Sequence, residues 1–297
     1  MKKFLLKGTY TALVTPFYDD GSIDFETLKE MIDFQIDSGI DGIVVCGSTG
    51  ESATLTVKEK MSLIIQSVEY SAGRVPVIAG TGTNSTQASI DMTIIAREHG
   101  ADAVLLVAPY YNKPSQEGLF EHYAAISDSV DIPQIIYNIP GRSCVNILPE
   151  TQLRLAEECE NIVATKEASG SLEQMTQICK YAPEGFSVIS GDDALTLPLI
   201  AVGGAGVIAV TSNYAPRQLG DMVKAALAGD FETARRINMK LFDLMQLNMV
   251  ETNPVPVKAA LSVMGKMEDI YRMPLLKIND RNRAKIEQAL RNADIIK

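Results

Sequence analysis

The sequence predicts a parallel α/β protein, a (β/α)8 TIM barrel with a C-terminal helical appendage. Short β-branched runs alternate with helical periodicity over the first two thirds of the chain. There are eight such runs, the number of strands that closes this kind of barrel. No strand pattern follows residue 210, and the rest of the sequence has helical periodicity only. These three observations favour one barrel followed by helices.

The expected strands are apolar runs of four to six residues, at 9–14, 42–46, 75–79, 103–107, 133–137, 162–165, 187–190 and 206–210. The segments between them have helical periodicity, at 24–38, 57–72, 85–99, 116–130, 149–159, 171–181 and a short 194–202. An open, doubly wound sheet is the alternative. It usually has fewer strands, and Gly80-x-Gly82 lacks the third glycine of a dinucleotide-binding fingerprint.

Several helix starts carry capping signals. Thr56 precedes Glu59 in capping-box spacing, Ser85 precedes an apolar run, and Pro149 suits a first helical turn. Beyond the last strand, helices are expected at 216–228, 231–248, 254–264 and 280–293. We therefore expect a catalytic barrel over residues 1–228 and a C-terminal helical domain over residues 229–297.

Composition limits the classes of partner. A net charge of −10 and a pI near 4.8 argue against nucleic acid and anionic membranes. No apolar run approaches the roughly 20 residues that span a bilayer, and the N-terminal apolar stretch is too short for a signal peptide. The four cysteines form no CxxC pair. We expect a cytoplasmic protein with reduced thiols.

Histidine is scarce, which narrows the chemistry. The chain has only His99 and His122, and neither has a metal-ligand spacing to other residues. Histidine-based triads and multi-histidine metal sites are therefore largely excluded, and we expect neither a metal nor a cofactor. Acid–base work falls to Lys, Tyr, carboxylates or hydroxyls.

Lys166 follows the apolar run 162–165 and is the leading catalytic candidate. An ammonium taken out of water loses solvation, which lowers its pKa and yields a neutral amine that can attack a carbonyl. The alternative is a lysine that reaches solvent at a strand end, paired with a neighbour such as Glu167.

Polar residues follow the other strands as well, and in a barrel they converge on one site. Tyr137 can transfer protons to or from an amine adduct, with Ser48 or Thr49 as a relay. Arg142 offers a guanidinium to a substrate carboxylate, and amides of the turn 47–50 suit a second carboxylate.

Each of these features also has a structural interpretation. The turn 47–50 can be only a turn before a helix, and Arg142 a surface cation. Tyr110 and Tyr111 can be packing or interface residues, and the Asp192–Asp193 pair a helix cap. Their joint occurrence at successive strand ends favours the catalytic interpretation.

The chain resembles the pyruvate-dependent class I aldolase and lyase family that includes dihydrodipicolinate synthase and N-acetylneuraminate lyase. The resemblance covers nearly the whole chain and includes Gly50-Glu51-Ser52-Ala53-Thr54-Leu55, Pro109-Tyr110-Tyr111-Asn112-Lys113-Pro114, Lys166-Glu167-Ala168-Ser169-Gly170 and Asn253-Pro254-Val255-Pro256-Val257-Lys258. The first three of these motifs, and Arg142 after Tyr137-Asn138-Ile139-Pro140-Gly141, are similar to the synthase branch.

The resemblance implies a role for each site residue. Lys166 would form a Schiff base with pyruvate, and Tyr137 would be the centre of a proton relay. Ser48, where the synthases usually have threonine, would be a second member, and Tyr111 from the neighbouring subunit the third. Thr49 would hold the pyruvate carboxylate and Arg142 the second substrate's carboxylate, while Gly191 and Ile208 would line the pocket.

The implied reaction is condensation of pyruvate with L-aspartate 4-semialdehyde to a cyclic hydroxy-tetrahydrodipicolinate, in lysine and diaminopimelate biosynthesis. The alternatives are an aldolase acting on a 2-keto-3-deoxy sugar acid or N-acetylneuraminate, which Ser48 leaves open, and a non-catalytic ligand-binding barrel. The implied assembly is a homodimer, often doubled to a homotetramer.

The resemblance also implies a lysine-effector cleft, here degenerate. Ser52, Ala53, Asn84 and Tyr110 fit such a cleft. Val57, Lys60 and Ala88 stand where polar or acidic ligands would be expected. Because Ala88 has no carboxylate to pair with an incoming ammonium and Lys60 would repel it, we expect weak or absent lysine inhibition.

Overall fold

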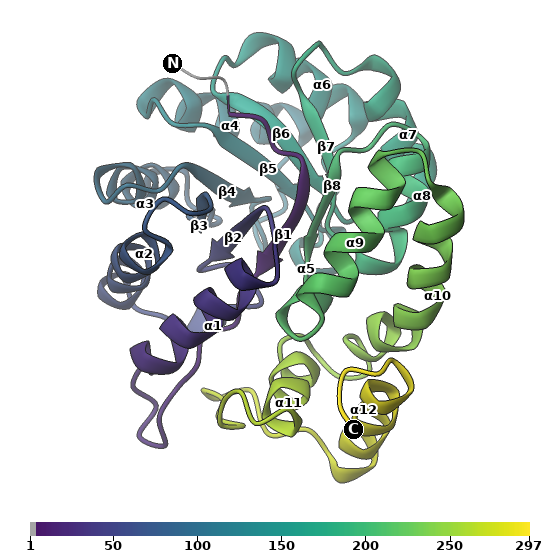
Figure 1. Cartoon of the computed structure of the whole chain (residues 1–297). Helices are drawn as coiled ribbons and strands as arrows, with labels where there is room; N and C mark the ends of the chain where they lie inside the picture. The colour runs from purple at the N-terminus through teal and green to yellow at the C-terminus, as the bar shows by residue number, and fades with distance from the viewer. Residues whose placement is uncertain (1–3) are drawn as a thin grey trace.

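Eight parallel strands form a closed barrel in chain order, in a computed structural model that describes residues 4–297 (Figure 1). The strands are β1 (Gly8–Ala12), β2 (Gly42–Val45), β3 (Val77–Gly80), β4 (Ala103–Val107), β5 (Gln134–Asn138), β6 (Ile162–Glu167), β7 (Ser187–Ser190) and β8 (Gly206–Ala209). The TIM-barrel prediction is confirmed, all eight expected runs form strands, and the open-sheet alternative is wrong.

Pairing of β1 with β8 closes the barrel, with Gly8 opposite Gly206. The two backbones meet so closely that a Cβ on Gly206 would lie 1.9 Å from the Gly8 carbonyl oxygen. Gly206 also has a φ of +147°, which side chains disfavour. Glycine is therefore required at this seam.

Helices surround the barrel: α1 (Phe25–Asp37), α2 (Val57–Ser71), α3 (Thr86–Glu98), α4 (Gln116–Ser129), α5 (Pro140–Ser143), α6 (Pro149–Glu158), α7 (Leu172–Tyr181), α8 (Thr196–Ala201) and α9 (Pro216–Leu227). The capping box of Thr56 with Glu59, the Ser85 cap and Pro149 in a first turn are confirmed. The four-residue α5 was not predicted, because one helical turn is too short to show periodicity.

Two apolar layers hold the barrel. One fills its interior, with Tyr10, Ile78, Leu105 and Ile208 among its members. The other lies between the strands and the outer helices. Successive side chains of a strand point to opposite faces, so residues that alternate along a strand enter different layers. This alternation decides which polar side chains reach the interior.

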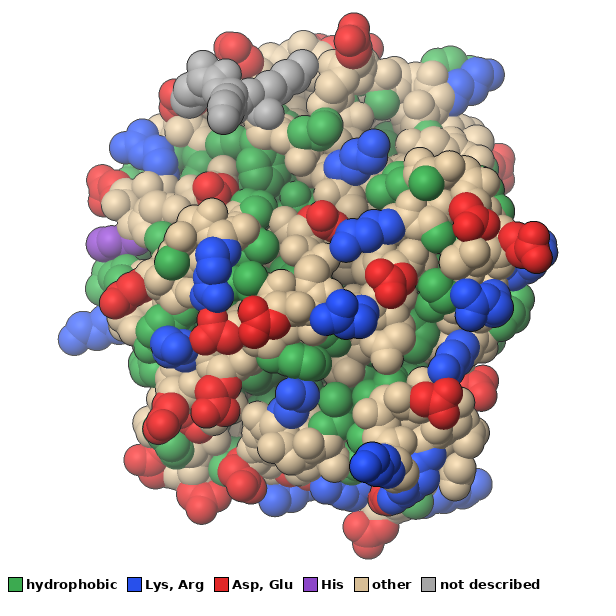
Figure 2. Space-filling view, in the orientation of Figure 1, with side chains coloured by type: hydrophobic (Ala, Val, Ile, Leu, Met, Phe, Trp, Pro, Cys, Tyr) green, Lys and Arg blue, Asp and Glu red, His purple; other side chains and the backbone are tan. Residues whose placement is uncertain are grey.

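The C-terminal helices α10 (Phe231–Leu247), α11 (Val255–Val263) and α12 (Asp280–Asn292) follow α9, as predicted. Figure 1 shows α11 and α12 together at one end of the barrel, with the C-terminus. None of the helices in residues 4–297 is long and apolar enough to cross a membrane. Acidic and basic side chains are interspersed on the face drawn in Figure 2.

Candidate active site

Lys166 lies inside the barrel. Strand β6 runs to Glu167, so Lys166 belongs to the strand, and only 5% of the residue is exposed. Burial lowers the pKa of its amine from 10.5 to about 8, with the nearby Arg142 guanidinium adding to the decrease and Asp193 opposing it. The interpretation of a solvated strand-end lysine is wrong, and a large share of this amine is neutral near pH 8.

Glu167 points outward, away from Lys166. Its carboxylate accepts hydrogen bonds from Asn138 on β5 (3.1 Å), Gln152 on α6 (2.9 Å) and Gln174 on α7 (3.1 Å). The alternation along β6 therefore separates the two charges, and the alternative in which Glu167 pairs with Lys166 is wrong.

Asp193 is the buried carboxylate whose charge acts on Lys166. It accepts hydrogen bonds from the amides of Val210 (3.1 Å) and Thr211 (2.6 Å), which follow β8. The expected helix cap is its neighbour Asp192, which accepts from the Ala194 amide (3.0 Å). The cap interpretation holds for Asp192 only, and the sequence alone did not separate the roles of these two acids.

Tyr137 lies beside Lys166 on the neighbouring strand. The two residues are register partners on β5 and β6, and the Lys166 Nζ lies 4.2 Å from the centroid of the Tyr137 ring. Burial raises the pKa of Tyr137 to about 12, while the Arg142 guanidinium and the Ser48 hydroxyl oppose the rise. The phenol therefore stays protonated at neutral pH and is suited to donate a proton.

Thr49 and Arg142 are connected through Asn253, which sequence reasoning did not single out. The Asn253 side-chain amide donates to the Thr49 hydroxyl (2.9 Å), and the Asn253 carbonyl accepts from the Arg142 guanidinium (3.0 Å). Asn253 lies 204 residues from Thr49 in sequence. The Arg142 residue is exposed, but this bond holds its guanidinium at the wall of the site.

Gly191 and Ile208 lie where the barrel interior meets Lys166. A Cβ on Gly191 would lie 3.0 Å from the Lys166 Cε and 2.7 Å from the Ala168 Cβ, so a side chain here would displace the lysine. Ile208 on β8 is buried in the interior layer with Tyr137 and Ile189.

A cavity of about 430 Å³ has Ser48, Tyr137 and Arg142 in its wall, whereas Lys166, Thr49, Gly191 and Ile208 are not among its lining residues. Of the proposed effector-cleft residues, Ser52, Ala53 and Tyr110 line this cavity, together with Lys60. Asn84 is outside the lining, and its carbonyl accepts a hydrogen bond from Asn112 (2.9 Å).

Tyr111 is not brought to the site within one chain. The residue is 88% exposed, and the neighbouring Tyr110 lines the cavity in its place. Within residues 4–297, no group of three or more His, Cys, Asp or Glu side chains is placed to hold a metal ion. His122 is buried, and its Nδ1 forms a hydrogen bond with the Thr86 hydroxyl (2.9 Å).

The sequence model of the Dihydrodipicolinate synthetase family matches residues 5–293. The chain belongs to this family. A 4-hydroxy-tetrahydrodipicolinate synthase of Koribacter versatilis is 48% identical over 293 residues, covering 98% of this chain and 97% of the relative. The family's enzymes are lyases of the class I aldolase type, and this chain is an enzyme of that type.

Solved structures of family members agree with the fold. The crystal structure of dihydrodipicolinate synthase from Aquifex aeolicus has a TM-score of 0.96 and 47% identity, covering 98% of this chain and 99% of that one. An enzyme of the same family from Cyanidioschyzon merolae, solved with lysine bound, has a TM-score of 0.95 and 41% identity over 98% of this chain and 99% of its own.

Proposed function

We propose that this enzyme condenses pyruvate with L-aspartate 4-semialdehyde through an imine on Lys166, giving 4-hydroxy-tetrahydrodipicolinate for lysine and diaminopimelate biosynthesis. The observation that carries the proposal is the buried Lys166 amine, with a pKa of about 8, beside the Tyr137 phenol. The matched family and its synthase members support the same reaction.

In the first half of the reaction the neutral Lys166 amine attacks C2 of pyruvate. The Tyr137 phenol, relayed by Ser48, protonates the carbinolamine oxygen, which leaves as water and yields the imine. Thr49, oriented by Asn253, donates a hydrogen bond to the pyruvate carboxylate. The Tyr137 phenolate left by this step takes a proton from C3, which gives an enamine, the carbon nucleophile. Gly191 and Ile208 shape the pocket around this adduct.

In the second half the enamine C3 attacks the aldehyde carbon, and the aldehyde oxygen takes up a proton. Arg142 binds the carboxylate of the aldehyde substrate, because a guanidinium matches a carboxylate in charge and geometry. The amino group of the aldehyde substrate then attacks C2 of the former pyruvate and displaces the Lys166 amine, which closes the ring. The sugar-acid aldolase alternative shares the imine but has no need for Arg142.

The relay is completed by a second copy of the chain. Because Tyr111 is exposed and does not line the cavity of its own chain, we propose that it enters the site of a partner subunit in a homodimer, which pairs into a homotetramer. In this proposal residues 1–228 are the catalytic barrel and 229–297 a C-terminal helical domain. The four free cysteines suit a reducing compartment, and we propose the cytoplasm.

We further propose that lysine inhibits this enzyme weakly or not at all. Lys60 lines the cavity beside Ser52, Ala53 and Tyr110, and its ammonium opposes a second cation. Ala88 supplies no carboxylate in compensation, unlike the acidic ligand expected there.

A coupled assay with different aldehydes tests the function. Purified protein is mixed with pyruvate and either L-aspartate 4-semialdehyde or the aldehydes released from sugar acids. We expect the kcat/KM for L-aspartate 4-semialdehyde to be at least about 100-fold above that for the other aldehydes. The neutral aldehydes lack the carboxylate that Arg142 binds. Equal or better turnover of a sugar aldehyde would favour the aldolase alternative.

A further inference from the structure

The turn 47–51 carries Ser48 and Thr49 and is held by contacts that the proposed mechanism does not use. Its own backbone closes it: the Gly50 amide donates to the Gly47 carbonyl (3.1 Å) and the Glu51 amide to the Ser48 carbonyl (3.2 Å). Glu51 has a φ of +54° and a ψ of 35°, a left-handed conformation that a side chain disfavours. The turn therefore needs external support to stay in this geometry.

Lys258 supplies one support from α11. Its Nζ lies 2.6 Å from the Glu51 Oε1, and both side chains are buried, with 0% and 1% exposed. The same ammonium donates to the Thr15 carbonyl (3.0 Å), and the Thr15 hydroxyl donates to the Gly50 carbonyl (2.7 Å). Lys258 thus connects α11 to the turn through two separate contacts.

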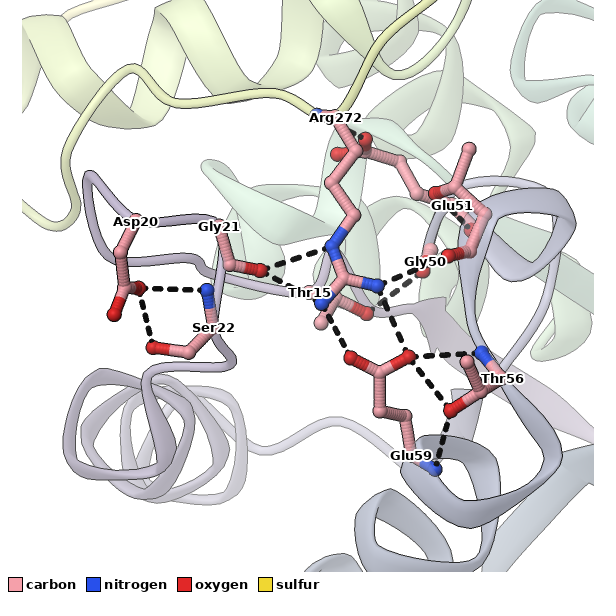
Figure 3. Close-up of polar contacts among 10 residues, drawn as sticks. Thr15, Asp20, Gly21, Ser22, Gly50, Glu51, Thr56, Glu59 and Arg272 are labelled. Carbon is pink, nitrogen blue, oxygen red and sulfur yellow. Dashed lines mark hydrogen bonds and ion pairs between the residues drawn. The ribbon is translucent and has the colours of Figure 1, made fainter.

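Arg272 supplies a second support. Its backbone amide donates to the Glu51 Oε2 (3.3 Å), so both carboxylate oxygens are occupied. Its guanidinium donates to the Gly21 carbonyl (2.7 Å) and pairs with Glu59 at the start of α2 (Figure 3). It also donates to the Thr54 carbonyl (2.9 Å). Segments far apart in sequence are tied together around one buried carboxylate.

A buried ion pair is a poor source of stability, because desolvation of two charges offsets most of their attraction. Well-packed neutral residues of similar size often stabilise such a position equally well. The charges of Lys258 and Glu51 are therefore better explained by the directed contacts they make than by packing. These contacts converge on the turn that carries two site hydroxyls.

We infer that Lys258 and Glu51 are positioning residues, whose buried ion pair fixes Ser48 and Thr49 against the substrate. The inference rests on the proposed function, which assigns Thr49 to the pyruvate carboxylate and Ser48 to the proton relay. Arg142 lies on a different element, α5, and is held by the backbone carbonyl of Asn253, whereas Thr49 contacts the Asn253 side chain. Loss of the pair therefore affects the pyruvate half of the reaction and spares recognition of the aldehyde.

The test is the double variant Glu51→Gln/Lys258→Met, which removes both charges and nearly preserves side-chain volume. We expect the double variant to fold. Its KM for pyruvate should rise about tenfold or more and its kcat should fall roughly 10- to 100-fold, because small displacements of catalytic groups have effects of this size. The KM for the aldehyde should change less than about twofold. A merely structural role would lower thermal stability or the active fraction and leave both KM values unchanged.

Arg283→Met is the matched control. Arg283 pairs with Asp269 (2.8 Å) in the same C-terminal region, and no hydrogen bond or ion pair among residues 4–297 joins it to the turn 47–51. We expect it to lower the midpoint of thermal unfolding and to leave both KM values as in the parent. An equal rise in the pyruvate KM of this control would overturn the specific role of the Glu51–Lys258 pair.

The remaining outcomes are also decisive. A folded double variant with the parent's pyruvate KM and kcat overturns the inference and leaves the proposed function intact. If the double variant does not fold, Glu51→Asp replaces it, because it keeps the charge but shortens the reach to Lys258; parental kinetics in that variant would overturn the inference equally. A parent protein with no pyruvate-dependent activity would refute the proposed function itself.

Discussion

The Lys166 Nζ lies 4.2 Å from the centroid of the Tyr137 ring, inside a barrel whose interior is otherwise mostly apolar. Burial acts on these two groups in opposite directions, lowering the pKa of the amine to about 8 and raising that of the phenol to about 12. The neutral amine is therefore accessible near neutral pH while the phenol keeps its proton. A nucleophile and a proton donor are thereby placed side by side.

Tyr137→Phe removes the hydroxyl of this residue and keeps its aromatic ring. We expect kcat to fall by roughly 100-fold or more, because general acid–base catalysis contributes about 10²–10⁴. The ring that contacts Lys166 remains, so unfolding in urea should change little. Tyr123→Phe is the control: its hydroxyl donates to the Leu106 carbonyl (3.0 Å) outside the active site, and its loss should affect stability but not kcat. Parental kcat in Tyr137→Phe would exclude the phenol from the relay.

Imine formation with pyruvate should depend on pH through Lys166. Only the neutral amine attacks, and with a pKa of about 8 its fraction rises from about a tenth at pH 7 to about nine tenths at pH 9. The rate of borohydride-trapped imine formation should therefore rise through pH 8 and level off above it. A midpoint near 10.5, the ordinary value, would show that burial does not activate this amine.

Arg142→Met should impair use of the aldehyde more than use of pyruvate. A charge-assisted hydrogen bond contributes about 1.5–3 kcal/mol, which corresponds to a roughly 10- to 100-fold rise in the KM for L-aspartate 4-semialdehyde. Arg142→Lys keeps the charge but not the planar fork and should give an intermediate value. Imine trapping with pyruvate alone measures the separate effect of losing the cation near Lys166, which should raise the pKa of its amine and slow imine formation at neutral pH. An unchanged aldehyde KM in Arg142→Met would remove the argument for an acidic second substrate.

Subunit mixing tests the role of Tyr111. Lys166→Met and Tyr111→Phe should each be strongly impaired alone. If Tyr111 acts in a partner's site, random reassembly in equal amounts makes half the dimers mixed, each with one complete site, and restores about a quarter of parental activity. If both residues act within one chain, no mixed dimer has a complete site and activity stays at the level of the separate variants.

Lysine should be a weak effector. Lys60 borders the cavity that holds Ser52, Ala53 and Tyr110, and Ala88 provides no opposing carboxylate. At saturating pyruvate, about 1 mM lysine should reduce the initial rate by less than half. Half-inhibition at a sub-millimolar concentration would refute this prediction.

Much of the architecture was predictable because it depends on local patterns. The eight β-branched runs and the capping signals at Thr56, Ser85 and Pro149 are encoded within a few residues. Strand ends were less predictable: β6 was expected to stop at residue 165, but it continues to Glu167. The outward-facing Glu167 carboxylate accepts hydrogen bonds from Asn138, Gln152 and Gln174, which only the folded chain brings together.

The candidate site divides in the same way. Lys166 and Tyr137 were predicted from strand ends, and the structure places them together. Asn253, Glu51 and Lys258 stand in motifs of the family resemblance, but their contacts were missed, since each contact joins segments more than 200 residues apart and no local pattern names the partner. The role of Tyr111 stays a prediction, because it concerns a second copy of the chain.

Reductive trapping with borohydride identifies the lysine that forms the imine with pyruvate. The protein is incubated with pyruvate and sodium borohydride, digested, and mapped by mass spectrometry, with Lys166→Met treated in parallel. We expect one reduced pyruvate adduct, on Lys166, with loss of activity in proportion to labelling and no adduct in the variant. Absence of an adduct in the active protein, or an adduct on another lysine, would contradict it.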